Sequence, residues 1–102
     1  MNLHQIEKAA SPENILIRLH ADDNVAVTRV NLDAGRRLVA GDRELITRAA
    51  IPSGHKVAIV HIREGEKVLR YGEAIGLAAR AIAPGEHVHT GNIIYQELSP
   101  AY

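Results

Sequence analysis

The chain has 102 residues, which is enough for one domain with a hydrophobic core but small for an enzyme that builds a deep cleft between two domains. Twelve Lys and Arg residues balance twelve Asp and Glu residues, so the formal net charge is zero and no nucleic-acid partner is expected. The absence of cysteine excludes disulfides, thiolate nucleophiles and thiolate metal sites.

The first ten residues contain no apolar segment of the kind found in signal peptides, and no later run approaches the ~20 apolar residues of a membrane span. We therefore expect a cytoplasmic protein without a membrane partner. The chain has three Tyr and neither Phe nor Trp, so its core must consist of Ile, Val, Leu and Ala. Because such a core is thin, we expect a partner protein or a second copy of the chain to complete it.

Residues 1–13 form a polar N-terminal lead-in, with a helical turn expected after Ser11 and Pro12, where serine caps the turn and proline suits its first position. Two β-rich runs follow, at 15–19 and 25–30, on either side of the polar loop 20–24. Further short strands are expected at 38–39, 44–50, 57–62, 67–71, 75–82 and 93–97, and residues 99–102 form a tail. The pattern predicts a single, mostly β domain over residues 14–98.

One seven-residue phrase occurs four times: an aliphatic residue, two others, glycine, two others and a second aliphatic residue. The copies cover residues 32–38, 51–57, 62–68 and 82–88. Glycine reaches positive φ without a steric penalty, so each copy predicts a tight turn between short strands whose apolar ends enter the core. The lead-ins at 47–51 and 78–82 are also alike, which predicts structurally equivalent halves.

The alanine-rich segment 73–83 leaves two alternatives open. Alanine is the best helix former, and Gly76 weakens a helix by only about 1 kcal/mol. The likeness of the two lead-ins favours a strand, which is the interpretation that we prefer.

Two histidines separated by one residue are the first candidate functional group. On a strand with Val88 pointing inward, His87 and His89 project from the same face, within reach of one ligand. Such a pair is common in metal sites, although a complete site needs three or four ligands. The same pattern equally fits an exposed polar face.

Three further places carry chemically capable side chains. The loop 20–24 combines an imidazole, two carboxylates and an amide, which suit a hard metal ion or a polyhydroxy substrate, or else a turn bonded to its own backbone. His55 and Lys56 follow Gly54, where another molecule can approach the backbone, or they form an exposed hairpin tip. Tyr71 either presents its phenol or packs its ring.

Taken together, these segments resemble the SAF-type domain of the altronate and galactarate dehydratases. The resemblance covers nearly the whole chain, at residues 20–25, 51–58, 62–72, 75–78, 82–89 and 92. In that family the domain is the N-terminal part of a long dehydratase or a separate small subunit, as in the related sulfolactate sulfo-lyase. A chain that runs from Met1 to Tyr102 resembles the separate subunit. The resemblance implies a β-clip fold of short strands, which agrees with the glycine turns.

The resemblance also implies roles for particular positions. The family's three recurring motifs fall on His20, Asp23, Asn24 and Val25; on Gly54, His55 and Lys56; and on Val88, His89 and Asn92. It implies that His55 and Lys56 are catalytic, whereas His87 and Asp22 lie outside the motifs. By the same resemblance, the residues that contact the substrate or an interface are Asp23, Asn24, Tyr71 and Asn92. The implied ligands of a divalent metal, iron or manganese, are His20 and His89.

Dehydration of a sugar acid removes a proton beside the carboxylate and expels a hydroxyl group, which requires a base, an acid and often a divalent metal. A chain of this size is not expected to hold all of these groups. The resemblance therefore implies an accessory subunit of a carbon–oxygen lyase, inactive alone, that contributes substrate or metal contacts to a site shared with a large catalytic subunit. The alternatives are the small subunit of a sulfolactate sulfo-lyase and a non-catalytic carbohydrate-binding or assembly module of the SAF type.

Overall fold

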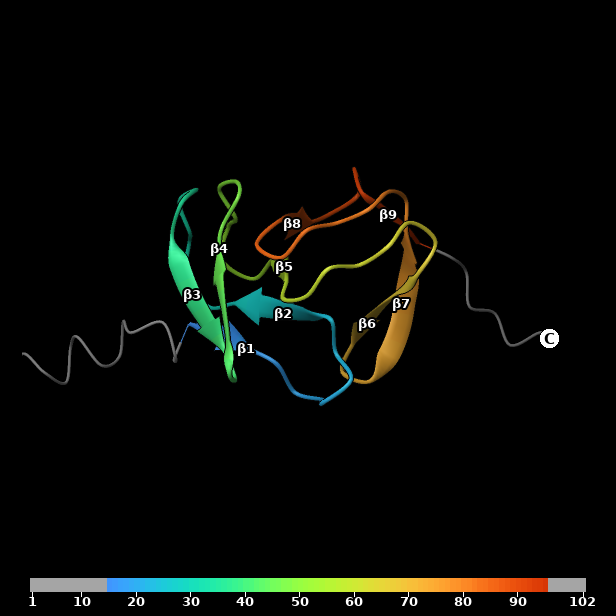
Figure 1. The fold of residues 1–102 in the computed structure, drawn as a ribbon, viewed down its shortest axis with the longest axis horizontal. Coiled ribbons are helices and arrows are strands. Elements are labelled where there is room, and N and C mark those ends of the chain that lie inside the picture. The colour runs from blue at the N-terminus through green and yellow to red at the C-terminus, as the bar shows by residue number, and fades with distance from the viewer. Residues whose placement is uncertain (1–14, 96–102) are drawn as a thin grey trace, which may run out of the picture.

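The computed structural model describes residues 15–95, and the regular structure within that range is entirely β (Figure 1). Its strands are β1 (Leu16–Ile17), β2 (Val25–Thr28), β3 (Arg37–Ala40), β4 (Arg43–Ile46), β5 (Lys56–Ala58), β6 (Lys67–Arg70), β7 (Glu73–Ala78), β8 (His87–Val88) and β9 (Ile93–Ile94). The expected mostly β domain is therefore confirmed. No helix long and apolar enough to cross a membrane occurs between residues 15 and 95. The helical turn predicted after Ser11 lies outside the described residues.

The strands form one antiparallel sheet between two hairpins. The central sheet has the order β1-β2-β5-β8, so strands far apart in the sequence pair with one another. Figure 1 shows the β3–β4 hairpin at one side of this sheet and the β6–β7 hairpin at the other. β9 pairs with β7 and makes the second hairpin a three-stranded sheet.

Each glycine phrase forms the predicted turn. The central glycines have φ between +84° and +92°, in the left-handed region that residues with a Cβ seldom adopt; they are Gly35, Gly54, Gly65 and Gly85. The first aliphatic residues of the phrases pair across the molecule in two antiparallel bridges, Leu32 with Ile51 and Ile62 with Ile82. The glycine turns thus connect the hairpins to the central sheet.

The two halves of the repeat, bounded by the bridges Leu32–Ile51 and Ile62–Ile82, form the same backbone hydrogen bonds. Gly35 N–H donates to the carbonyl of Thr47 at 2.8 Å, and Gly65 N–H donates to that of Ala78 at 2.8 Å. The hairpins differ by a β-bulge between Val68 and Leu69, which makes the second hairpin one residue longer between its bridges. The structure confirms the prediction of equivalent halves.

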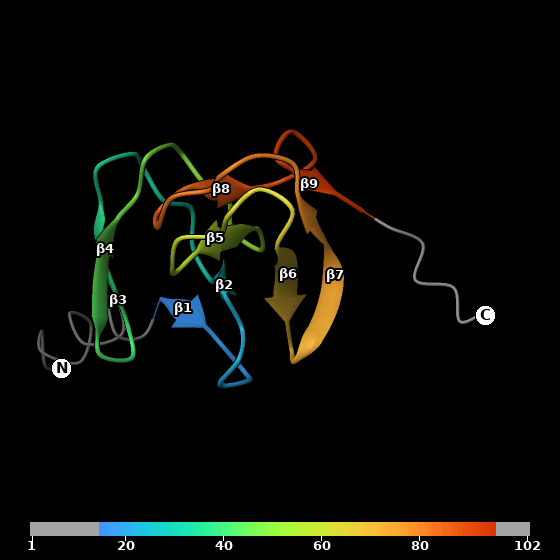
Figure 2. The ribbon, with the colours of Figure 1, turned by 45° about the vertical axis from the view of Figure 1, so that its right-hand side comes forward.

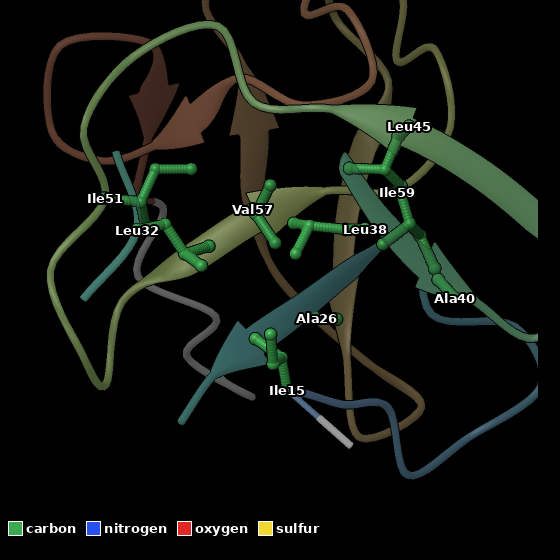
Figure 3. Close-up of a cluster of buried hydrophobic side chains, with 9 residues drawn as sticks. All are labelled: Ile15, Ala26, Leu32, Leu38, Ala40, Leu45, Ile51, Val57 and Ile59. Carbon is green, nitrogen blue, oxygen red and sulfur yellow. The ribbon is translucent and has the colours of Figure 1, made fainter. Parts of the chain in front are cut away.

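The hydrophobic core divides into two clusters, one for each half. Figure 3 shows the first, composed of Ile15, Ala26, Leu32, Leu38, Ala40, Leu45, Ile51, Val57 and Ile59. The second is composed of Val25, Ala58, Ile62, Val68, Ala78, Ile82, Val88 and Ile93. The aliphatic residues at both ends of all four phrases belong to these clusters, and none is more than 2% exposed. Burial of each such side chain stabilises the fold by about 1.5–3 kcal/mol.

Several predicted strands are shorter in the structure than in the sequence-based prediction. The strands expected at 44–50, 57–62 and 75–82 end at Ile46, Ala58 and Ala78, and the one expected at 15–19 covers only 16–17. The prediction extended strands into the aliphatic residues that open the glycine phrases, and those residues form isolated bridges instead. The preferred strand in segment 73–83 is confirmed as β7.

Candidate functional site

β8 places two imidazoles on one face of the domain. Val88 is 1% exposed and packs in the second core cluster, so the residues on either side of it point outward. The rings of His87 and His89 stack with their centres 4.5 Å apart. The predicted projection of both imidazoles from one face is confirmed.

The pairing of β5 with β8 adds a third histidine. His55 immediately precedes β5, whose Val57 lies opposite His87 in the ladder. Nδ1 of His55 and Nε2 of His87 are 2.9 Å apart, which is a hydrogen bond between the two rings. His87 therefore lies between the other two imidazoles. The family motifs do not include His87, and its spacing from His89 was the sequence signal that indicated it.

The environment of His87 keeps its ring neutral. Burial lowers the pKa of His87 below its usual value of 6.5, and the nearby charges of His89, His55 and Lys56 lower it further. A neutral imidazole has one N–H and one free nitrogen, so His87 can either donate to His55 or accept from it. The hydrogen bond can thus carry a proton from one ring to the other.

Asn92 holds the turn that follows β8. Its side chain is 1% exposed: Oδ1 accepts from the backbone N–H of His89 at 2.9 Å, and Nδ2 donates to the carbonyl of His87 at 2.8 Å. The Gly91 N–H donates to Nδ1 of His89 at 3.2 Å, so neutral His89 carries its proton on Nε2. Asn92 therefore positions the histidines, because both polar atoms of its amide bond to the backbone of this chain.

A second histidine turn repeats this pattern in the loop 20–24. The backbone N–H of Asp22 donates to Nδ1 of His20 at 3.1 Å, and that of Asp23 donates to the His20 carbonyl at 3.1 Å. The corresponding bond to the carbonyl of His89 comes from Asn92 N–H at 3.0 Å. In both turns the fourth residue is buried, at 3% exposure for Asp23.

Asp23 fastens its loop to the β6–β7 turn. Its carboxylate accepts from the backbone N–H groups of Tyr71 at 2.9 Å and Gly72 at 2.7 Å. Burial alone would raise the pKa of Asp23, but the amides of Gly72, Tyr71 and His20, together with the charge of His20, outweigh it and lower the pKa below 3.8. Asp23 is therefore ionised at neutral pH.

Asn24 extends the same attachment to β6. Its Nδ2 donates to the carbonyl of Lys67 at 2.9 Å, and its Oδ1 accepts from the N–H of Leu69 at 2.7 Å. The side chain thus donates to and accepts from the β6 backbone as a neighbouring strand would, and it joins the 20–24 loop to the second hairpin.

Tyr71 is exposed beside His20. Its φ of +57° places it in the left-handed region, where its own N–H and that of Gly72 hold the turn by donating to Asp23. The residue is 47% exposed. The Arg70 guanidinium lies 5.2 Å from the centre of its ring. A Cβ on Gly72 would lie only 2.7 Å from the His20 ring, so the imidazole packs directly on the backbone of this turn.

The predicted site residues fall into two groups at opposite ends of the central sheet. In the antiparallel pairing of β2 with β5, Asn24 bonds to Ile59 at one end of the ladder, and His55 bonds to Thr28 at the other. Figures 1 and 2 show the 20–24 loop with the β6–β7 turn along the lower edge and β8 along the upper edge. His20 therefore lies at the opposite end of the sheet from His55 and His89.

Comparison with known proteins agrees with the resemblance found in the sequence. The sequence profile of the altronate/galactarate dehydratase SAF domain matches residues 14–96. The chain belongs to this family. The SAF domain is 40% identical over 76 residues to altronate dehydratase of Escherichia coli K12, covering 74% of this chain and 15% of that protein. It is 40% identical over 95 residues to galactarate dehydratase (L-threo-forming) of the same organism, covering 90% and 17%.

A third relative is much closer to this SAF domain in length. The (2R)-sulfolactate sulfo-lyase subunit alpha of Chromohalobacter salexigens is 41% identical over 80 residues, which cover 72% of this chain and 85% of that subunit. The chain thus spans less than a fifth of the length of either dehydratase and nearly all of the length of the subunit.

The structure separates the two histidines that the family resemblance implied as metal ligands. His20 lies at one end of the pairing of β2 with β5, whereas His89 lies near His55 at the other end. Among residues 15–95, no three histidine or carboxylate side chains are placed to hold one ion.

Two adjoining hollows open on the histidine face. One is lined by residues 54–56, 87–90 and 95, and the other by residues 48, 49, 80, 86, 87 and 89. His87 and His89 belong to both. The ammonium group of Lys56 lies 6.0 Å from the centre of the Tyr95 ring at the edge of the first hollow. The three imidazoles and Lys56 therefore face solvent from one concave surface, where a substrate or a partner protein can reach them.

Proposed function

We propose that this SAF domain is the small subunit of a sugar-acid dehydratase and that its histidine face completes a site shared with a large catalytic subunit. The hydrogen-bonded pair of His55 and His87, open to solvent beside Lys56, is the observation that supports this role. The relatives support it further, because this domain forms a small fraction of each dehydratase. The large subunit supplies the remaining catalytic groups.

In this proposal His55 is an acid–base catalyst. Dehydration removes the proton on the carbon beside the carboxylate and releases a hydroxyl group as water, so a proton must be accepted and another delivered. His55 exchanges a proton with the substrate through Nε2, while its Nδ1 exchanges one with Nε2 of His87. Lys56 contributes positive charge beside the enediolate that forms, and no step requires a metal held by this chain.

The opposite end of the domain has a different role. His20 and Tyr71 are exposed together on a loop and a turn that Asp23 and Asn24 hold rigidly. We assign this surface to contact with the large subunit. Asp23, Asn24 and Asn92 then act as positioning residues, because their polar atoms bond to this chain.

A sulfo-lyase is the second candidate, favoured by one observation. The match covers 85% of the sulfo-lyase subunit alpha, whose name identifies it as one component of an enzyme of several subunits. Elimination of sulfite from sulfolactate also removes a proton beside a carboxylate, so the role of His55 is unchanged. Only the leaving group differs.

The experiment starts from an affinity-tagged chain expressed in its native cells. We expect a large lyase subunit to co-purify and the assembled complex to turn over altronate, galactarate or (2R)-sulfolactate, which decides between the two candidates. The His55→Gln variant should lower kcat by about 10²–10⁴-fold, the usual contribution of an acid–base group. His61→Gln is the matched control, because His61 is exposed and lies outside both hollows.

Two results would contradict the proposal. Appreciable turnover by the purified chain alone would refute the shared site. Equal kcat values for the His55 and His61 variants would remove His55 from the chemistry.

A further inference from the structure

The second hollow brings an arginine from the first half of the chain to the histidines of the second half. Arg48 follows β4, and its backbone N–H donates to the carbonyl of Gly85 at 2.9 Å. This approach requires glycine, because a Cβ on Gly85 would lie 2.0 Å from the carbonyl oxygen of Ile46. The contact places Arg48 in the lining of the hollow together with His87 and His89.

Arg48 lies near the ion pair of Glu86 and Arg80 in this hollow. Glu86 and Arg80 form an ion pair at 3.0 Å, and the Ala83 N–H donates to the same carboxylate at 2.7 Å. Burial opposes ionisation of Glu86, but the Ala83 amide and the charges of Arg80 and Arg48 lower its pKa, so it stays ionised and neutralises Arg80. Within the described range, the side chain of Arg48 makes no hydrogen bond or ion pair.

His89, which lines the same hollow, offers a second hydrogen-bond donor. Since Nδ1 of His89 accepts the Gly91 N–H, the Nε2–H of neutral His89 is available to a ligand. A guanidinium group and an imidazole N–H that line one hollow form a donor set for a planar anion. Arginine in particular binds carboxylates through two parallel N–H···O bonds.

We propose that Arg48, together with His89, binds a carboxylate of the substrate in this hollow. The inference rests on the proposed function, because the hollow shares His87 and His89 with the site where His55 acts. An anion held by Arg48 directs the adjacent carbons of an open-chain hydroxy acid toward the first hollow. Arg48 therefore selects acids over the corresponding neutral polyols.

The test uses the assembled enzyme with Arg48→Gln and Arg48→Lys. Hydrogen bonds to a charged group contribute about 1.5–3 kcal/mol, so KM should rise about 10- to 150-fold in Arg48→Gln, with a smaller change in kcat. Arg48→Lys retains the charge but not the two parallel donors, and its KM should fall between those of the wild type and Arg48→Gln. Arg43→Gln on β4 is the matched control, because this exposed arginine lies outside the hollows.

Two small inhibitors separate carboxylate from sulfonate as the bound group. 3-Hydroxypropanoate and 2-hydroxyethanesulfonate carry the same two-carbon chain and hydroxyl group and differ only in the anionic group, so their inhibition constants compare the two anions directly. We expect 3-hydroxypropanoate to compete with substrate and to lose this competition in Arg48→Gln. Stronger, Arg48-dependent inhibition by the sulfonate would overturn the carboxylate assignment.

The failure of this inference is distinct from the failure of the proposed function. A complex that turns over none of the three acids refutes the proposed function. An active complex in which His55→Gln is impaired, while Arg48→Gln keeps the KM of Arg43→Gln, refutes the role of Arg48 alone. Thermal melting of each variant verifies that the domain remains folded.

Discussion

Replacing Asp23 with asparagine tests how the 20–24 loop is held. The side chain is 3% exposed, and its two oxygens accept backbone N–H groups at 2.9 and 2.7 Å. An asparagine of the same shape has one oxygen and one NH2, so one of the two amides would face a donor. Loss of a charge-assisted bond together with a buried unsatisfied amide costs about 2–4 kcal/mol. The total stability of such a domain is about 5–15 kcal/mol, so the loss is measurable.

The assay is urea unfolding followed by circular dichroism at several pH values, with Asp22→Asn as the matched control. The Asp22 side chain is 77% exposed, so its replacement should change the free energy of unfolding by less than about 0.5 kcal/mol. Because folding lowers the pKa of Asp23 from 3.8, the contribution of its carboxylate is complete above that pH and is lost as the pH falls through the folded-state pKa. The Asp23→Asn variant should lack this component of acid destabilisation. Equal unfolding free energies for the two variants at pH 7 would refute the reasoning.

Three further predictions concern the upper edge of the domain. Gly85→Ala should destabilise the fold by about 3 kcal/mol or more, because the added Cβ would clash with a carbonyl oxygen. Gly35 also has positive φ but has open space around it, so Gly35→Ala should cost only about 1–2 kcal/mol. Equal melting temperatures for the two variants would contradict this prediction. Asn92→Ala should lower the free energy of unfolding in urea by about 2–4 kcal/mol and shift the imidazole NMR signals of His87 and His89. Unchanged signals would exclude a positioning role for Asn92. The NMR titration of His87 should have its midpoint below pH 6.5. Since folding lowers the pKa of His87, the free energy of unfolding should fall as the pH decreases through 6.5. The His87→Asn variant should lack this part of the pH dependence.

The strand ends show where prediction from sequence reached its limit. The glycine phrases identified the turns because positive φ is a local property of glycine, and the alternation around Val88 placed His87 and His89 on one face. The predicted strands ran too far because the sequence does not reveal whether an aliphatic residue continues a ladder or forms an isolated bridge. Ile62 and Ile82 are buried in either arrangement, and only their pairing with each other distinguishes the two.

The sequence by itself determined the glycine turns, the mostly β class, the likeness of the two halves and the family. The tertiary structure decided which polar groups meet. The contact of His55 with His87 joins residues 32 positions apart, and it exists because β5 pairs with β8. The same antiparallel order carries His20 to the opposite end and brings Arg48 to the histidines. Turn conformation depends on neighbouring residues, whereas these contacts depend on strand order and register, which are set by packing of the two cores.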